Sequence, residues 1–244
     1  MALEESEDAF GQIFNDYFYE RDGTGEIVER DDGYVDISCG GAFYFSQYRD
    51  WPEYEKAAMK FVKGKVLDIG CGAGRHSLFL QKKGFEILGI DASPLAIEVC
   101  KRRGLNNARV LSIADISADL GMFDTILMLG NNFCLVGTPD RGKKLLRELT
   151  AITADRGRIV AQTRDPYKTD KPEHFEYHAS NRKQGKMSGQ ARIRIRYKKY
   201  ATPWFDFLMT SREEMQAILD NTCWQITECI EGNEGIFVAI MDKI

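Results

Sequence analysis

Short runs of apolar residues alternate with amphipathic stretches through the middle of the chain. The apolar runs cover residues 65–70, 86–91, 108–113, 123–129 and 158–163. Several are too continuously apolar for strands with one solvated face, as is typical of parallel strands covered on both sides. Helical patterns separate most of them. This alternation predicts an α/β fold with a doubly wound, mostly parallel sheet.

Capping residues mark where the intervening helices begin and end. Ser93 is an N-cap candidate with Pro94 at the first helical position, and Gly104 fits the end of the same helix. Thr138 and Pro139 open another helix in the same way. Both helices follow a predicted strand, as expected for repeated strand–helix units.

The N-terminal part of the chain follows a different pattern. A possible helix over residues 7–19 is followed by a hairpin signal at Asp32-Gly33, and a core helix is predicted over 52–62. We therefore predict an N-terminal cap over residues 1–46, in front of a core domain over residues 47–244.

The C-terminal part also departs from the alternation. Residues 191–201 are predicted to form one long strand, and residues 224–230 and 235–242 two further strands joined by a turn. The segment at about 165–191 is then an insertion in the core domain, placed before the last strands.

Composition excludes several classes of protein. The chain has 244 residues and a net charge of −4, and no apolar run approaches the roughly 20 residues that span a bilayer. Its six cysteines include no CxxC pair, which favours a reduced protein without a structural zinc site. We expect a cytoplasmic protein with no bound metal and no membrane partner.

Charge is unevenly distributed along the chain. Residues 1–55 hold fifteen acidic and three basic side chains, whereas residues 165–200 hold ten basic and four acidic ones. Opposite charges attract over about a Debye length, so the two segments are candidates for direct contact. The competing interpretation is a pair of separate solvated surfaces.

A glycine-rich turn follows the first apolar run. In Asp68-Ile69-Gly70-Cys71-Gly72-Ala73-Gly74 the glycines let the backbone approach a ligand at the N-terminus of the next helix. A dinucleotide site would want a small residue at position 75, where Arg75 stands, and Asp68 is poorly placed beside a pyrophosphate. The turn therefore favours a ligand that carries positive charge.

The ends of the next strands carry further candidate contacts. Asp91 ends the second strand, where a carboxylate can accept hydrogen bonds from both hydroxyls of a ribose. Asp115 and Ile116 follow the third strand, at a position where an adenine amino group can be recognised. Leu129-Gly130-Asn131-Asn132 ends the fourth strand.

In that order and spacing, the segments VLDIGCGAGRHS, GIDAS, ADI and FDTILMLGNN resemble class I S-adenosylmethionine-dependent methyltransferases over about residues 60–165. The resemblance implies a seven-stranded, Rossmann-like sheet with an antiparallel C-terminal strand, and S-adenosyl-L-methionine as cofactor. It also implies that the glycines pass the amino-acid part of the cofactor, with ribose, adenine and methionine contacts at the strand ends. The predicted cofactor residues are Asp68, Gly70, Cys71, Gly72, Gly74, Asp91, Ala92, Asp115, Ile116, Leu129 and Gly130.

The absence of certain motifs narrows the range of possible methyl acceptors. No Asn-Pro-Pro-aromatic or Asp-Pro-Pro-aromatic sequence and no Pro-Cys pair follows the fourth strand, which disfavours methylation of adenine or amide nitrogens and of cytosine C5. The candidate substrate contacts are Asn131, Asn132, Arg164 and Tyr19. No catalytic residue is assigned, although His76 is a candidate base; a residue at its position more often packs or caps the first helix.

The predicted function is methyl transfer to a small-molecule acceptor. A competing hypothesis is an RNA or protein methyltransferase that docks through the basic strand 192–199, although the negative net charge disfavours nucleic acid as a partner. The sequence is also compatible with a non-catalytic S-adenosylmethionine-binding protein and, less well, with a dinucleotide-dependent oxidoreductase. The oligomeric state is left open.

Overall fold

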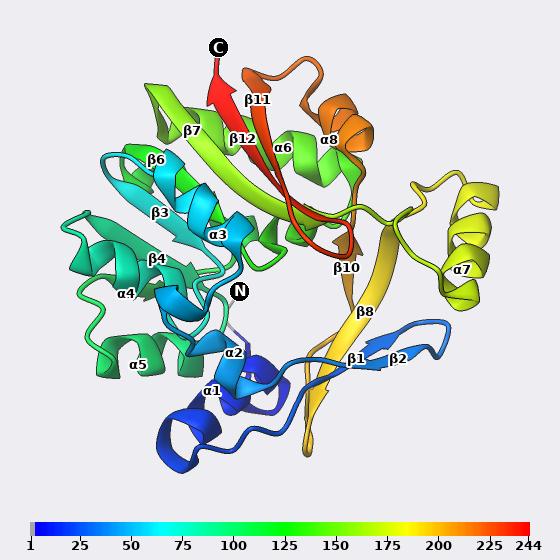
Figure 1. Cartoon of the computed structure of the whole chain (residues 1–244), viewed down its shortest axis with the longest axis horizontal. Helices are drawn as coiled ribbons and strands as arrows, with labels where there is room; N and C mark the ends of the chain where they lie inside the picture. The colour runs from blue at the N-terminus through cyan, green and yellow to red at the C-terminus, as the bar shows by residue number, and fades with distance from the viewer. Residues whose placement is uncertain (1–2) are drawn as a thin grey trace.

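The computed structural model describes residues 3–244 and contains two β-sheets (Figure 1). The larger sheet has the strand order β11-β12-β7-β6-β3-β4-β5. Its strands are β3 (Val66–Ile69), β4 (Ile87–Asp91), β5 (Ala108–Val110), β6 (Phe123–Met128), β7 (Thr153–Arg164), β11 (Trp224–Glu231) and β12 (Ile236–Lys243). Strands β3 to β7 pair in parallel, and β12 runs antiparallel to both β7 and β11. The predicted doubly wound sheet with an antiparallel C-terminal strand is confirmed.

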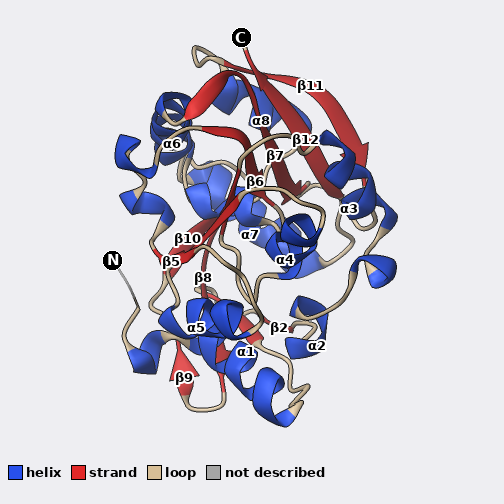
Figure 2. Ribbon diagram, turned by 90° about the vertical axis from the view of Figure 1, so that its left-hand side faces the viewer, coloured by secondary structure: helices blue, strands red, loops and turns tan. Residues whose placement is uncertain are grey.

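Helices cover both faces of this sheet (Figure 2). Leu80 packs in one core cluster with Val66, and Leu146 packs in another with Leu67 on the opposite face. Because consecutive strand residues alternate between faces, Asp68 points to the same side as Val66. The first side carries α3 (Glu53–Ala58), α4 (Arg75–Lys82) and α5 (Pro94–Arg102), and the second carries α6 (Pro139–Ala151) and α8 (Arg212–Leu219).

The predicted caps account for the helix ends. The Ser93 hydroxyl accepts a hydrogen bond from the Ala96 N–H at 2.9 Å at the start of α5, and Thr138 caps α6 in the same way. Gly104, just beyond α5, has a φ of +95°, a conformation that favours glycine at a helix end. These ends are therefore determined locally, as expected.

A second, antiparallel sheet joins the N-terminal segment to residues 190–208. Its order is β10-β8-β1-β2, and β1 and β8 are direct partners, with Val28 opposite Ile195. The strands are β1 (Ile27–Arg30), β2 (Val35–Ile37), β8 (Gln190–Tyr197), β9 (Tyr200–Ala201) and β10 (Phe205–Leu208).

The prediction of a single strand over residues 191–201 is wrong. The chain reverses at Lys198, which has a φ of +52°, and β9 then pairs with the end of β8. The predicted division into a cap over 1–46 and a core with an insertion at 165–191 stays a prediction, and residues 1–2 of that cap lie outside the described residues.

Helix α1 (Ala9–Glu20) packs between β8 and the α5 side of the larger sheet. Ile13 and Phe14 share a core cluster with Ile195 of β8, Val99 of α5 and Ala73 of the glycine-rich turn. The N-terminal segment thus packs against the turn that the sequence singled out. Two further helices complete the fold, α2 (Gly41–Tyr44) and α7 (Pro172–Lys183).

The acidic and basic segments meet, so their predicted contact is confirmed. Glu29 of β1 pairs with Arg194 at 2.9 Å and with Arg196 at 3.4 Å. Lys198 pairs with Asp16 at 2.7 Å and with Asp22 at 2.8 Å. These ion pairs link β1 and helix α1, near the start of the sequence, to β8 and Lys198, near its end.

Within residues 3–244, no helix has the length and apolar character required to cross a membrane. The same residues contain no group of three or more His, Cys, Asp or Glu side chains placed to hold a metal ion. All six cysteines are free.

Candidate functional site

The glycine-rich turn joins β3 to α4 and needs its glycines. Gly70, Gly72 and Gly74 have φ values of +71°, +53° and +80°. A Cβ at Gly70 would lie 2.5 Å from the amide nitrogen of Asn132, and one at Gly72 would lie 3.3 Å from the ring of Phe14. Side chains are therefore excluded by backbone conformation and by close neighbours, which leaves main-chain groups to face a ligand.

Asp68 lies one residue before the end of β3, just ahead of this turn in the sequence. Its side chain is buried, and its Oδ2 accepts a hydrogen bond from the Ser77 hydroxyl of α4 at 2.6 Å. Burial raises the pKa of Asp68, because the charged carboxylate loses contact with water. Such a group gains from a cation brought close to it, in agreement with the predicted preference for a positively charged ligand.

Asp91 ends β4 and is fixed beside the turn by both of its oxygens. Oδ2 accepts a hydrogen bond from the Gly72 N–H and Oδ1 accepts one from the Ser93 N–H, each at 2.9 Å. Burial raises the pKa of Asp91 to about 6, although these two bonds oppose the shift. A carboxylate offers about four lone-pair positions, so further hydroxyl donors can still be accepted. Ala92 follows, partly buried.

The ends of β5 and β6 supply the remaining predicted contacts. Asp115 closes a short 3-10 helix, Ile113–Asp115, and is exposed, whereas Ile116 is buried in the core. Leu129 is buried after β6, and Gly130 has a φ of +70°. Because β3, β4, β5 and β6 are parallel neighbours, these positions lie along one edge of the sheet with the glycine-rich turn.

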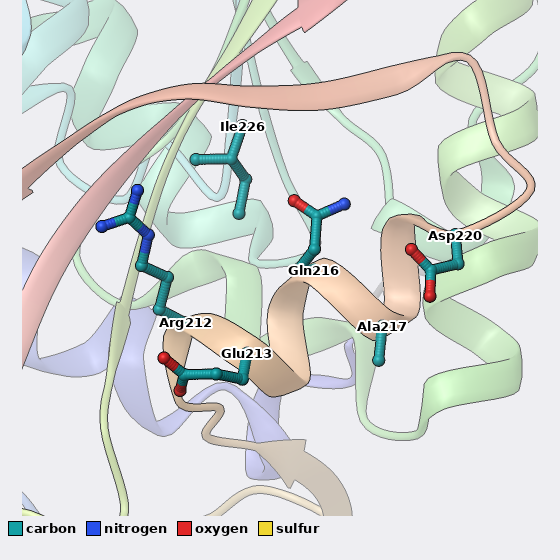
Figure 3. Close-up of a pocket in the computed structure, with 6 residues that line it drawn as sticks. All are labelled: Arg212, Glu213, Gln216, Ala217, Asp220 and Ile226. Carbon is teal, nitrogen blue, oxygen red and sulfur yellow. The ribbon is translucent and has the colours of Figure 1, made fainter.

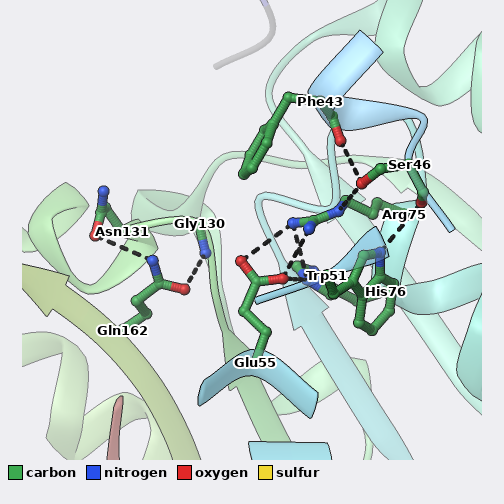
Figure 4. A network of polar contacts seen from close by, with 9 residues as sticks. All are labelled: Phe43, Ser46, Trp51, Glu55, Arg75, His76, Gly130, Asn131 and Gln162. Atoms are coloured by element: carbon green, nitrogen blue, oxygen red, sulfur yellow. Dashed lines mark hydrogen bonds and ion pairs between the residues drawn. The ribbon is translucent and has the colours of Figure 1, made fainter. Parts of the chain in front are cut away.

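The two asparagines after β6 differ in whether their amide donors remain available to a ligand. Asn132 donates from Nδ2 to the carbonyls of Ile69 at 2.8 Å and Gly70 at 2.9 Å, which uses both of its amide protons. Asn131 accepts a hydrogen bond from Nε2 of Gln162 at 3.3 Å, and Oε1 of Gln162 accepts one from the Gly130 N–H at 3.1 Å (Figure 4). Asn132 therefore braces the turn, while the amide donors of Asn131 have no hydrogen-bond partner among residues 3–244.

Comparison with known proteins finds a matching family model and a similar solved structure. Residues 66–157 match the family described as "Methyltransferase domain". An S-adenosylmethionine-dependent methyltransferase from Bacteroides fragilis, solved in complex with S-adenosyl-L-homocysteine, is 25% identical and superimposes with a TM-score of 0.84 over 100% of this chain and 98% of its own. Residues 66–157 thus form a methyltransferase-family domain, and the whole chain shares the fold of an S-adenosylmethionine-dependent methyltransferase.

Curated relatives of this chain are named for different acceptors. A 23S rRNA (uracil(747)-C(5))-methyltransferase from Pyrococcus abyssi is 32% identical over 50% of this chain and 29% of its own length. A 2-heptyl-1-hydroxyquinolin-4(1H)-one methyltransferase from Mycobacteroides abscessus is 41% identical over 27% of this chain and 32% of its own. The chain thus spans about a third of the length of these relatives.

Two further predicted substrate contacts, Tyr19 and Arg164, make their side-chain contacts with other parts of the molecule than the glycine-rich turn. Tyr19 is 53% exposed at the end of α1, where the guanidinium of Arg102 lies 5.6 Å from its ring. Arg164 ends β7 and pairs with Glu234 at 3.0 Å. Among residues 3–244, neither side chain has a hydrogen bond or ion pair that joins it to the glycine-rich turn.

A buried ion pair that the sequence did not reveal links α3 to the start of α4. The Arg75 guanidinium lies 2.9 Å from the carboxylate of Glu55, and its Nε donates to the Ser46 hydroxyl at 2.8 Å. The rings of Phe43 and Trp51 lie 4.4 and 4.9 Å from the guanidinium carbon (Figure 4). Arg75, the residue that argued against a dinucleotide, therefore anchors the segment before α3 to the turn.

His76 belongs to the same cluster. Its Nε2 lies 3.3 Å from the Glu55 carboxylate, and its ring packs on Trp51. Burial alone raises the pKa of Glu55, but His76 and Arg75 outweigh burial and hold this pKa below its ordinary value. The neighbours of His76 thus give it a packing and positioning role.

A buried hydrogen-bonded pair, Tyr44 with Glu26, was also not predicted from the sequence. Tyr44 donates its hydroxyl to Glu26 at 2.6 Å, and Glu26 also accepts from the Gly40 N–H at 3.2 Å. Burial and the Glu26 carboxylate raise the pKa of Tyr44 well above its ordinary value. The Tyr44 ring packs on Phe14, with centroids 5.0 Å apart, and Phe14 adjoins Gly72. This pair therefore lies on the cap side of the glycine-rich turn.

A pocket of about 370 Å³ lies elsewhere, between α8 and β11 (Figure 3). It contains none of the predicted cofactor or substrate residues. Its lining residues are Arg212, Glu213, Gln216, Ala217, Asp220 and Ile226.

Proposed function

We propose that the protein transfers a methyl group from S-adenosylmethionine to a small-molecule acceptor. A sulfonium supplies an already activated methyl group, so the protein has to position the two reactants and exclude water. An amine or thiolate acceptor needs no further base. This agrees with the packing of His76, and no catalytic base is assigned.

The strand ends fit the cofactor chemically. The turn at Gly70–Gly74 leaves only main-chain groups on its surface, and the Asp91 carboxylate keeps lone pairs for ribose hydroxyls. Asp68 supplies a buried carboxyl group just ahead of the turn. The residues that would hold the cofactor are those predicted from the sequence: Asp68, Gly70, Cys71, Gly72, Gly74, Asp91, Ala92, Asp115, Ile116, Leu129 and Gly130.

One observation carries the choice of a small acceptor: most basic side chains of the strand 192–199 are already paired with carboxylates of this protein. Arg194, Arg196 and Lys198 all pair with acidic residues of the N-terminal segment. The same segment packs against the turn through Phe14. Asn131 is the preferred candidate for a substrate contact, because its amide donors have no partner among residues 3–244. Asn132, Arg164 and Tyr19 stay secondary candidates. A cytoplasmic location also stays a prediction, supported by six free cysteines.

Calorimetry tests the cofactor. We expect S-adenosylmethionine and S-adenosylhomocysteine to bind with micromolar affinity, on the order of −8 kcal/mol, and NADH to show no heat of binding. Binding of NADH alone would overturn the cofactor assignment.

Methyl-labelled cofactor tests the acceptor. The full chain is incubated with labelled S-adenosylmethionine and a cell extract, and the products are separated by size. Label in the low-mass fraction supports a small acceptor. Label in RNA or protein would contradict it, and an unlabelled extract with bound cofactor would indicate a non-catalytic binding protein.

A further inference from the structure

A pocket of about 520 Å³ opens on the outer side of α4, against the segment that precedes α3. None of the residues predicted to hold the cofactor or the acceptor lines it, although Arg75 of its wall begins the helix that follows the glycine-rich turn (Figure 4). Its volume suits a small organic ligand. The lining residues are Ser46, Gln47, Tyr48, Arg49, Trp51, Arg75, Leu78, Phe79, Lys82, Lys83 and Arg103.

The lining has five cationic side chains and no carboxylate. Glu55 neutralises Arg75, and Asp50 lies 3.6 Å from Arg49. The remaining three cations, Lys82, Lys83 and Arg103, have no carboxylate at ion-pair distance within residues 3–244. The wall therefore carries uncompensated positive charge in a protein that is acidic as a whole.

Arg103 is the least solvated of these three cations. It donates to the carbonyl of Ala73, in the glycine-rich turn, and lies 4.3 Å from the ring of Phe45. Burial lowers the pKa of Arg103, because the guanidinium is partly withdrawn from water without a counter-ion. A partly buried cation of this kind is stabilised by an anion that enters the pocket.

An aromatic surface lies beside these cations. The rings of Tyr48 and Phe79 are parallel, with centroids 4.4 Å apart and an angle of 2° between their planes. Tyr48 is still 37% exposed, so its ring keeps open surface for a second planar group. Parallel stacking on an aromatic ring next to Lys and Arg side chains is a common way to hold a nucleobase and its phosphate.

We propose that this pocket binds a nucleoside monophosphate, with the phosphate at Lys82, Lys83 and Arg103 and the base stacked on Tyr48. A single nucleotide fits the volume of the pocket, whereas a long polynucleotide would meet an acidic protein whose basic strand is mostly paired already. The contact of Arg103 with Ala73 ties the pocket to the glycine-rich turn, so binding here is coupled to cofactor binding. The proposal holds whether or not the chain transfers a methyl group.

Calorimetry of the full chain with AMP tests the proposal. Saturating S-adenosylhomocysteine is present throughout, so that AMP cannot occupy the adenosine part of the cofactor site. Adenosine, inorganic phosphate and a single-stranded oligoribonucleotide are titrated in parallel. We expect AMP to bind about tenfold more tightly than adenosine or phosphate, because only AMP uses both the cations and the ring.

Two variants locate the binding. The double substitution Lys82→Glu with Lys83→Glu lowers AMP affinity at least about tenfold, and Tyr48→Ala lowers AMP affinity while leaving phosphate affinity unchanged. Lys143→Glu with Lys144→Glu, a matched pair on α6, leaves both unchanged. Thermal melting and S-adenosylhomocysteine binding check that each variant is folded. No AMP binding, equal losses in both lysine pairs, or tighter binding of the oligoribonucleotide than of AMP would overturn the proposal.

Discussion

Asp91 is the single residue whose charge is most closely tied to the proposed cofactor site. It joins the end of β4 to the glycine-rich turn through the Gly72 N–H. Burial raises its pKa to about 6 in the ligand-free protein. Because its raised pKa favours the protonated form, its contribution to folding stability is fully present below the ordinary Asp pKa and is lost as the pH rises through about 6.

Cofactor binding has the opposite dependence on pH. Ribose hydroxyls donate to the carboxylate form, so we expect the affinity for S-adenosylhomocysteine to be highest above pH 6 and to fall by up to about tenfold per pH unit below it. Calorimetry between pH 5 and pH 8, at intervals of about half a unit, measures this.

The variant Asp91→Asn is the matched test of the same residue. The asparagine side chain cannot ionise, so we expect this variant to bind S-adenosylhomocysteine about tenfold or more weakly at neutral pH. The part of the pH dependence of binding that comes from Asp91 should also disappear. Asp119→Asn, on the exposed surface, serves as control. An unchanged pH profile in Asp91→Asn would show that another group is responsible.

Gly70 tests the steric part of the site. Gly70→Ala places a Cβ against the Asn132 amide, which cannot move without breaking its two hydrogen bonds, and it also strains a φ of +71°. We expect a loss of about 2–4 kcal/mol of unfolding free energy, measured by urea denaturation. Gly84→Ala has a similar positive φ but open space around its Cβ, and should lose only about 1 kcal/mol. Equal losses would rule out the steric explanation.

At the scale of elements, Asp8 determines how α1 docks on α5. Its Oδ1 accepts the Gly11 N–H at 2.9 Å and so caps α1, while Oδ2 accepts the Ser93 hydroxyl at 2.8 Å and the Leu95 N–H at 3.2 Å. One buried carboxylate thus satisfies donors at the start of two helices.

Removing this carboxylate should loosen the N-terminal segment. We expect Asp8→Ala to lose about 2 kcal/mol of unfolding free energy in urea, because a cap and two inter-helix hydrogen bonds disappear together. Glu5→Ala, in the preceding turn, should change stability by less than about 0.5 kcal/mol. If the two variants unfold at the same urea concentration, Asp8 does not carry the docking.

At the scale of the whole molecule, internal pairing determines which charges remain free. The acidic N-terminal segment faces the basic strand β8, and the hydrogen bond from Arg194 lowers the pKa of Glu29. The pocket lined by Tyr48, Lys82, Lys83 and Arg103 then keeps a basic wall that is not compensated in this way.

Removing the carboxylate of Glu29, which pairs with two arginines of β8, should therefore create weak affinity for RNA. We expect Glu29→Gln to free Arg194 and Arg196 and to raise the affinity for a single-stranded oligoribonucleotide a few-fold at about 50 mM salt, an effect lost at high salt. Fluorescence anisotropy measures it, with Glu228→Gln, at an exposed residue that has no ion pair among residues 3–244, as a control of equal charge change. Tight binding by the unmodified chain would contradict the proposed small acceptor.

The sequence by itself determined the larger sheet and the cofactor turn. Apolar runs, helix caps such as Ser93 and the glycines at 70, 72 and 74 are local signals, since each depends on backbone conformation or on residues a few positions away. Asp91 and Asp68 could be predicted for the same reason, because they lie at or next to the carboxyl ends of strands whose order follows from alternation.

Only the tertiary structure decided the second sheet and the buried pairs. Val28 and Ile195 are paired across most of the chain, and no local pattern encodes that register. Glu55 with Arg75, and Glu26 with Tyr44, come from separate elements, so their contacts depend on how those elements pack. The charge asymmetry predicted that the two segments meet, but only the folded chain shows which acidic residues pair with the arginines of β8.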